Sequence, residues 1–165
     1  MEKKQLPEDF KDFIRYLNSH NVEYLLVGGW AVSLYGNPRL TKDIDFLISS
    51  KDENIDKLKK ALDDFGAPPI DIEMYKKEKD SVIRMGVSPI QIDVIKQATG
   101  IIMEECYKRK EVLYLDDLKI NVISIKDLII NKRAAGRDQD ITDANTLEKF
   151  INLKENEYIS IKENK

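Results

Sequence analysis

The sequence predicts a single α/β domain, of the α+β kind, on three observations. Short apolar strands alternate with amphipathic helices, and two pairs of strands are joined by tight turns typical of β-hairpins. The 165 residues contain no repeat and no linker that would divide them. A chain of this length buries about two thirds of its unfolded surface in one core. We expect one domain over residues 1–165, with the Lys-, Glu- and Asn-rich residues 154–165 as a frayed tail.

The first part of the chain predicts a helix, a strand and a short second helix. The first helix, residues 8–20, is indicated by apolar residues at the spacing of one helical face: Phe10, Phe13, Ile14 and Leu17. Residues 22–27 are almost wholly apolar, which predicts a buried strand ending at Gly28-Gly29. Residues 30–35 then predict one or two helical turns, because Gly36-Asn37-Pro38 follows them.

The next segments predict a strand and a longer helix. Residues 43–49 have the apolar character of a strand, and Ser50 opens the following helix as part of a capping box. Gly66 ends that helix. Residues 70–75 are expected to form a strand and residues 76–80 a turn.

The second half of the chain predicts two hairpins and three helices. The hairpins pair residues 81–87 with 90–96 and residues 112–115 with 119–123. The helices are expected over residues 99–110, 125–135 and 138–153. Ser124 with Asp127 forms a second expected capping box, and Gly136 separates the last two helices.

Composition argues for a soluble protein and places it in the cytoplasm. Apolar residues make up 42% of the chain, but no apolar run approaches the roughly 20 residues of a membrane span. The N-terminus has no apolar segment that could serve as a signal peptide, and the single cysteine, Cys106, cannot form an internal disulfide. The net charge of −3 argues against broad, non-specific wrapping of nucleic acid, although a local basic patch is compatible with it.

Asp43 and Asp45 stand at the start of an apolar strand. Residues two apart in a strand point the same way, so both carboxylates lie on one face. Mg²⁺ prefers oxygen ligands and commonly takes one or two carboxylates together with substrate phosphates. The pair alone is weak evidence, because acidic residues two apart occur at five places in the chain and Asp43 is equally consistent with a solvated strand start.

Gly28-Gly29 lies between a buried strand and a short helix. Without Cβ atoms the backbone can approach an anion closely, and the free N–H groups of a helix start point toward it. This pattern is typical of a phosphate site. Two glycines after a strand are also found in ordinary tight turns.

Asp93 lies in the middle of a strand otherwise built of Ile and Val. A carboxylate there costs free energy unless it is paired or holds a metal, or unless the strand is an edge strand that faces water. Three carboxylates can hold two metal ions about 4 Å apart. The order of Gly28-Gly29, Asp43, Asp45 and Asp93 is therefore the observation on which the site prediction depends.

With these residues in view, the chain resembles the nucleotidyltransferase superfamily, which has a polymerase-beta-like catalytic core. The matching segments are Leu26-Val27-Gly28-Gly29-Trp30-Ala31, Arg39-x-Thr41-x-Asp43-Ile44-Asp45-Phe46 and Ile92-Asp93-Val94. The chain is also similar to the small bacterial AbiEii-type toxin branch, through residues 123–129 and Lys132-Arg133-x-x-Gly136-Arg137-x-x-Asp140-x-x-Asp143. The resemblance implies a mixed β-sheet flanked by helices, the nucleotidyltransferase fold.

The resemblance also implies the roles of the site residues. Asp43 and Asp45 would be metal ligands, and Asp93 a ligand or the base for an acceptor hydroxyl. The residues implied in nucleotide binding are Gly28, Gly29, Arg39, Thr41, Lys132 and Arg137. Spacing alone would fit equally well a Lys132 on a solvated helix face. Asp140 and Asp143 could orient Lys132 or Arg137 through ion pairs, or could simply cap the helix. Many superfamily members have Gly-Ser in place of Gly28-Gly29, so one hydroxyl contact to phosphate is missing here.

The implied reaction transfers a nucleoside monophosphate from a nucleoside triphosphate such as ATP to a hydroxyl, with Mg²⁺, most simply two ions, as cofactor. The acceptor is left open among tRNA, a protein and a small molecule. The toxin branch implies an antitoxin partner. Two alternatives stand beside this reading: an antibiotic nucleotidyltransferase of the lincosamide or aminoglycoside kind, and a catalytically silent nucleotide-binding module.

Overall fold

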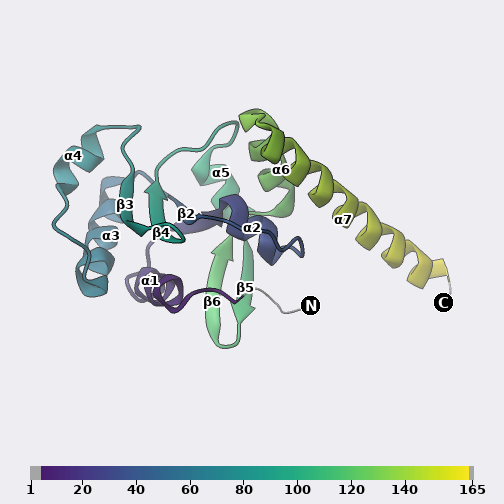
Figure 1. The fold of residues 1–165 in the computed structure, drawn as a ribbon, viewed down its shortest axis with the longest axis horizontal. Helices are drawn as coiled ribbons and strands as arrows, with labels where there is room; N and C mark the ends of the chain where they lie inside the picture. The colour runs from purple at the N-terminus through teal and green to yellow at the C-terminus, as the bar shows by residue number, and fades with distance from the viewer. Residues whose placement is uncertain (1–4, 164–165) are drawn as a thin grey trace.

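A computed structural model describes residues 5–163 of the chain. Within these residues six strands form one sheet in the order β3-β4-β2-β1-β6-β5 (Figure 1). The strands are β1 (Tyr24–Val27), β2 (Asp43–Ile48), β3 (Ile83–Val87), β4 (Ile90–Ile95), β5 (Glu111–Leu115) and β6 (Leu118–Val122). The helices are α1 (Glu8–Ser19), α2 (Gly28–Leu34), α3 (Asp52–Phe65), α4 (Ile72–Lys77), α5 (Met103–Lys108), α6 (Ile125–Ala135) and α7 (Asp138–Glu163).

The sheet is mixed. β1 pairs with β2 in antiparallel orientation, whereas β2 with β4 and β1 with β6 are parallel pairs. The hairpins β3–β4 and β5–β6 extend the sheet on its two sides. The predicted α/β fold class, a mixed sheet flanked by helices, is confirmed.

The two faces of the sheet differ in what covers them. Phe46 points to the face covered by α1, where its ring lies 5.4 Å from that of Phe13. Ile44 and Ile48 in β2 and Val94 in β4 are also fully buried. Asp45 points to the other face, which carries α2. The alternation of apolar and acidic residues in β2 thus separates the core from the site.

The capping box predicted at Ser50 is wrong. α3 begins two residues later, at Asp52, with Lys51 as its N-cap residue and no side-chain cap. The Asn54 side chain explains the difference: it donates to the Ser49 carbonyl at 2.9 Å and also bonds both backbone groups of Glu23. These contacts fix the chain between β2 and α3, so the helix starts beyond Ser50.

Two further elements differ from prediction. Residues 72–77 form the helix α4 instead of a strand and turn, because the Asp71 carboxylate caps the helix by accepting from the Met74 backbone N–H at 3.0 Å. The helix expected over residues 99–110 is shortened to α5. Gly100 has a φ of +79°, and the Thr99 carbonyl accepts from the Asn131 side chain at 2.9 Å, which holds this segment in a turn.

Both predicted hairpins, and the helices before and after Gly136, are confirmed. Ser124 caps α6 by accepting from the Asp127 backbone N–H at 3.1 Å, while the Asp127 carboxylate accepts from Arg109. α7 leaves the body of the molecule and is helical to Glu163 (Figure 1). The frayed tail over residues 154–165 stays a prediction, and residues 164 and 165 lie outside the described part. None of the described helices has the length and apolarity needed to cross a bilayer.

Candidate active site

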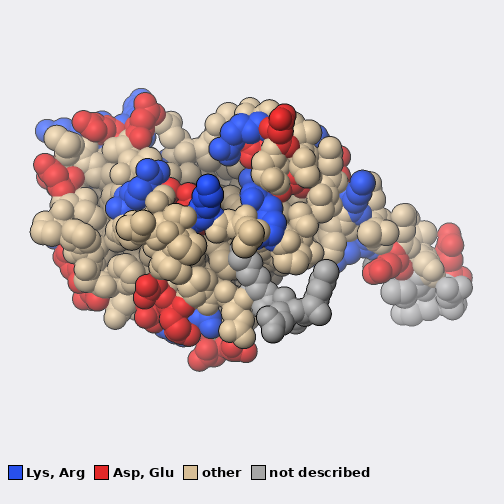
Figure 2. All heavy atoms as spheres, viewed as in Figure 1, with Lys and Arg blue, Asp and Glu red and all other residues tan. Residues whose placement is uncertain are grey.

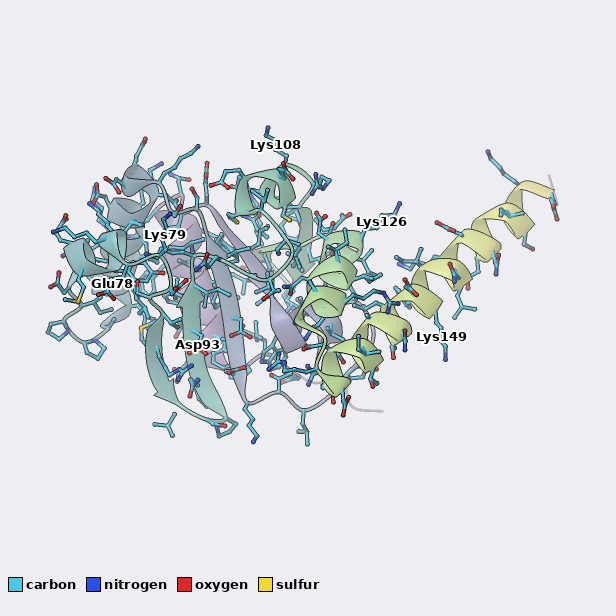
Figure 3. The ribbon with its side chains drawn as sticks, turned by 90° about the horizontal axis from the view of Figure 1, so that it is seen from above. Glu78, Lys79, Asp93, Lys108, Lys126 and Lys149 are labelled. Atoms are coloured by element: carbon cyan, nitrogen blue, oxygen red, sulfur yellow. The ribbon has the colours of Figure 1, made fainter. Side chains whose placement is uncertain are left out.

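The register of the sheet brings three carboxylates together. Asp45 on β2 lies directly opposite Asp93 on β4, and Asp43 lies two residues earlier on the same face of β2. One carboxylate oxygen from each of the three lies within 4.8 Å of the others. Figure 3 labels Asp93 on β4, the strand between β2 and the edge strand β3. Asp93 is therefore not a solvated residue of an edge strand, which was the alternative reading of the sequence.

The diglycine segment packs directly on this cluster. Gly28 and Gly29 form the first turn of α2, and Gly28 has a φ of +69°. A Cβ atom on Gly28 would lie 2.4 Å from Oδ2 of Asp45, and one on Gly29 would lie 2.6 Å from Cγ2 of Thr41. A side chain at Gly28 would be strained by its left-handed backbone and would push Asp45 aside, and a side chain at Gly29 would displace Thr41. The backbone reaches the carboxylates with no side chain in between.

Burial and the negative charges of neighbouring carboxylates raise the pKa values of Asp43 and Asp45. The pKa of the Asp45 carboxyl is raised to about 7, first by burial and then by the negative charges of Asp43 and Asp93. The pKa of Asp43 is raised for the same two reasons, burial first and then Asp93. The cations close enough to oppose these shifts are Arg39, Arg84, Lys132 and Arg137. Mutual repulsion of this kind is what a bound divalent cation relieves, so the donor set fits such an ion.

These shifts predict how stability depends on pH in the absence of metal. Between about pH 4 and about pH 7 the folded chain keeps the Asp45 proton while the unfolded chain has lost it, so a rise in pH favours unfolding. From pH 5 to pH 8 in EDTA, the wild type should lose on the order of 1–3 kcal/mol of unfolding free energy relative to Asp45→Asn. Urea denaturation of both proteins measures this. Parallel pH curves for the two would show that Asp45 titrates normally.

Arg84 is a site residue that sequence reasoning missed. It lies opposite Asp93 on β3, and its Nε and Nη2 donate to the two Asp93 carboxylate oxygens at 2.9 and 3.2 Å. The Gln91 side chain donates to the same two oxygens at 3.3 and 3.4 Å. A signal existed in the sequence: a two-residue turn at Ser88-Pro89 pairs residues whose numbers sum to 177, and therefore pairs 84 with 93.

The junction of α6 and α7 contributes a second set of ion pairs beside the cluster. Lys132, which is buried, lies 3.3 Å from Oδ1 of Asp140 and 3.2 Å from Oδ2 of Asp143. Arg39 donates to Asp143 at 3.0 Å, which ties the loop before β2 to α7. Arg137 pairs with Asp140 through Nε at 2.7 Å while its side chain stays largely exposed. Spacing alone allowed a solvated Lys132, and the structure instead surrounds it with acidic partners.

Asp140 serves mainly to hold these cations. Burial acts to raise its pKa, but the hydrogen bonds from Arg137 and Lys132 outweigh burial, so the pKa lies below its usual range. Thr41 stabilises the loop before β2, since its Oγ1 donates to the Asp43 backbone carbonyl at 3.1 Å. Figure 2 shows Lys and Arg side chains on both sides of a small acidic area on one face of the molecule. At the cluster itself, the positive charges of Arg39, Arg84, Lys132 and Arg137 act on the aspartates, so the site is an acidic centre with basic residues around it.

Comparison with known proteins gives the family. The family model described as a nucleotidyltransferase of unknown function, DUF6036, matches residues 4–160. No curated protein matches the chain.

Solved structures share the fold. One is the lincomycin-bound lincosamide antibiotic adenylyltransferase LnuA, at 19% identity and a TM-score of 0.56 over 88% of this chain and 98% of that one. A second, a putative nucleotidyltransferase from Thermotoga maritima, has 15% identity and a TM-score of 0.54 over 88% and 91%. A nucleotidyltransferase-like protein from Paracoccidioides brasiliensis has 18% identity and a TM-score of 0.52 over 87% and 73%. Because the family model spans nearly all of it, the chain belongs to the DUF6036 family and is a nucleotidyltransferase.

Proposed function

We propose that the chain transfers a nucleoside monophosphate from a nucleoside triphosphate to a hydroxyl of an acceptor, in a metal-dependent reaction centred on Asp43, Asp45 and Asp93. The observation that carries the proposal is the convergence of these three carboxylates within 4.8 Å, against the Gly28 backbone. Within the family, this geometry supports a reaction at the surface around these three aspartates.

The three aspartates would hold Mg²⁺, most simply two ions. Such ions supply charge neutralisation for the phosphates and activation of a hydroxyl. The absence of Cβ atoms at Gly28 and Gly29 lets the start of α2 lie close to Asp45 and Thr41, where the triphosphate would bind. Of the residues implied in nucleotide binding, Arg39 and Thr41 lie in the loop before β2, and Lys132 and Arg137 lie at the α6–α7 junction. Arg39 and Lys132 both pair with Asp143, which joins the two segments.

The order of the strands supports one direction of approach for the acceptor. Gly28 follows β1, and moving across the sheet from β1 one meets Asp45 on β2, Asp93 on β4 and then β3. In phosphoryl-type transfer the attacking and leaving oxygens lie roughly in line. If pyrophosphate leaves on the diglycine side, the acceptor hydroxyl approaches from the β3–β4 side. Asp93 is the carboxylate on that side, as a ligand or as the base that takes the hydroxyl proton.

The proposal extends to the acceptor and the biological setting. The resemblance to AbiEii-type toxins implies a toxin with an antitoxin partner, and tRNA is one acceptor compatible with it. An antibiotic acceptor is the alternative, and the fold is shared with a lincosamide adenylyltransferase. A catalytically silent module is the rival from another class. The convergence of three carboxylates argues against that rival, because a module without metal chemistry gains nothing from like charges held together.

The experiment is an assay of pyrophosphate release with Mg²⁺ and each of the four nucleoside triphosphates. Total bacterial RNA and lincomycin are tested separately as acceptors, and labelled nucleotide is followed into each. We expect pyrophosphate release with at least one pair, and none with Asp45→Asn. Label in RNA favours the toxin setting, whereas label in lincomycin favours the antibiotic one. Equal release by Asp45→Asn would exclude this site.

A further inference from the structure

The contact between Arg84 and Asp93 occupies a carboxylate that the proposed reaction needs. Both Asp93 oxygens accept from the Arg84 fork, and both accept from the Gln91 amide as well. A carboxylate offers about four lone-pair sites on its two oxygens. Three nitrogens, two from Arg84 and one from Gln91, thus contact the two Asp93 oxygens, so a metal held by Asp93 would compete with these donors.

Arg84 is the donor that can leave. Its side chain is 62% exposed while that of Asp93 is 7% exposed, so water can solvate the guanidinium once it leaves the carboxylate. Arg84 belongs to the edge strand β3, and no strand lies outside it in the described sheet. The charges of Asp93, Asp43 and Asp45 all act on it. The Arg84 guanidinium is thus a positive charge placed beside the three clustered carboxylates.

A second arginine, Arg109, shows the same geometry on a carboxylate that belongs to no metal-binding group found among the described residues. Arg109 donates to Asp127 through Nε at 3.0 Å and Nη2 at 3.1 Å, with the guanidinium side chain 54% exposed and the carboxylate buried. Asp127 lies at the start of α6 and is not one of the three clustered carboxylates. The Arg109–Asp127 pair is therefore a control for the Arg84–Asp93 pair, because the two differ in whether other carboxylates surround the aspartate.

We propose that Arg84 is a positioning residue: in the metal-free enzyme its guanidinium takes the place of a cation on Asp93, and divalent metal displaces it. This inference rests on the proposed metal-binding role of Asp43, Asp45 and Asp93. The exchange keeps the buried Asp93 charge compensated in both states. It also releases a guanidinium on the β3–β4 side, where the acceptor approaches.

Metal binding to variants tests the competition. Mn²⁺ binding without nucleotide, followed by electron paramagnetic resonance, should be about three- to tenfold tighter for Arg84→Gln than for the wild type, because the metal no longer competes with a charged hydrogen-bond donor. Arg109→Gln should bind Mn²⁺ as the wild type does. Equal or weaker binding by Arg84→Gln would overturn the exchange and leave Arg84 as a simple support for Asp93.

A second measurement uses the unmutated protein and so does not depend on a variant folding well. Phenylglyoxal modifies arginine side chains, and its rate at each one is followed by peptide mass spectrometry. Mn²⁺ should raise the rate at Arg84 at least about twofold and leave Arg109 unchanged; an unchanged Arg84 rate at saturating Mn²⁺ would overturn the exchange. If Asp45→Asn binds Mn²⁺ as tightly as the wild type, the metal site itself fails, and the exchange fails with it.

Discussion

Replacing Asp45 with asparagine should reduce pyrophosphate release by at least about 1000-fold. Asp45 is the central member of the cluster, next to Asp43 along β2 and opposite Asp93 on β4. Asparagine keeps the shape but removes the charge that would hold the metal ions, and a loss of about 4 kcal/mol of transition-state stabilisation corresponds to about 1000-fold in rate. The rate is measured with saturating Mg²⁺ and the nucleotide and acceptor found to be active.

The same substitution should make the metal-free protein more stable at pH 8, because it removes a carboxylate whose pKa is raised by burial and by like charges. Loss of activity together with gain of stability separates a site residue from a structural one. Asp56→Asn is the control, since its exposed side chain pairs with Lys76 away from the cluster. It should leave the rate unchanged. An Asp45→Asn enzyme that retains a tenth of the activity would contradict the assignment.

Replacing Gly28 with alanine should reduce the rate by about 100-fold or more while costing only about 1–2 kcal/mol of stability. The stability cost comes from a left-handed backbone, with φ of +69°, that alanine adopts poorly. The rate falls because the new Cβ would lie 2.4 Å from Oδ2 of Asp45, so that carboxylate must rotate out of the cluster. Displacement of a catalytic group by about 1 Å costs on the order of 100-fold.

Gly66→Ala is the matched control for this effect. Gly66 also has a left-handed backbone, with φ of +86°, but a Cβ there would meet nothing within 4 Å. It ends α3, away from the cluster. Gly66→Ala should lose about as much stability as Gly28→Ala, measured by urea denaturation, and keep its full rate. Equal rates for the two variants would show that the close approach of Gly28 to Asp45 is not required.

The parts of the fold that could be predicted from the sequence are those with a strong local signal. The turn at Ser88-Pro89 and the strands beside it fix a hairpin register, and the alternation in β2 puts Asp43 and Asp45 on one face. The parallel pairing of β2 with β4 has no local signal, because it joins residues 48 positions apart. The convergence of Asp93 on Asp45 therefore came from the resemblance and is now seen in the geometry.

The elements that were predicted wrongly depend on contacts that a single sequence does not reveal. α4 is held by the Asp71 cap, in a polar segment whose apolar residues are too few to show a period. The start of α3 depends on Asn54 reaching back to Glu23, across more than thirty residues. Arg84 was passed over for a different reason. Its hairpin partner was predictable, but an exposed arginine on an edge strand is usually a solvated surface residue.

The most direct test of the central claim is the number of divalent ions that the cluster binds. Mn²⁺ binding is measured at pH 8 by equilibrium dialysis, in the presence of a non-hydrolysable ATP analogue, for the wild type and Asp45→Asn. If Asp43, Asp45 and Asp93 form the metal site, the wild type should bind two ions beyond those held by the free analogue, and Asp45→Asn should lose at least one of them. Identical Mn²⁺ binding by the two proteins would contradict the account.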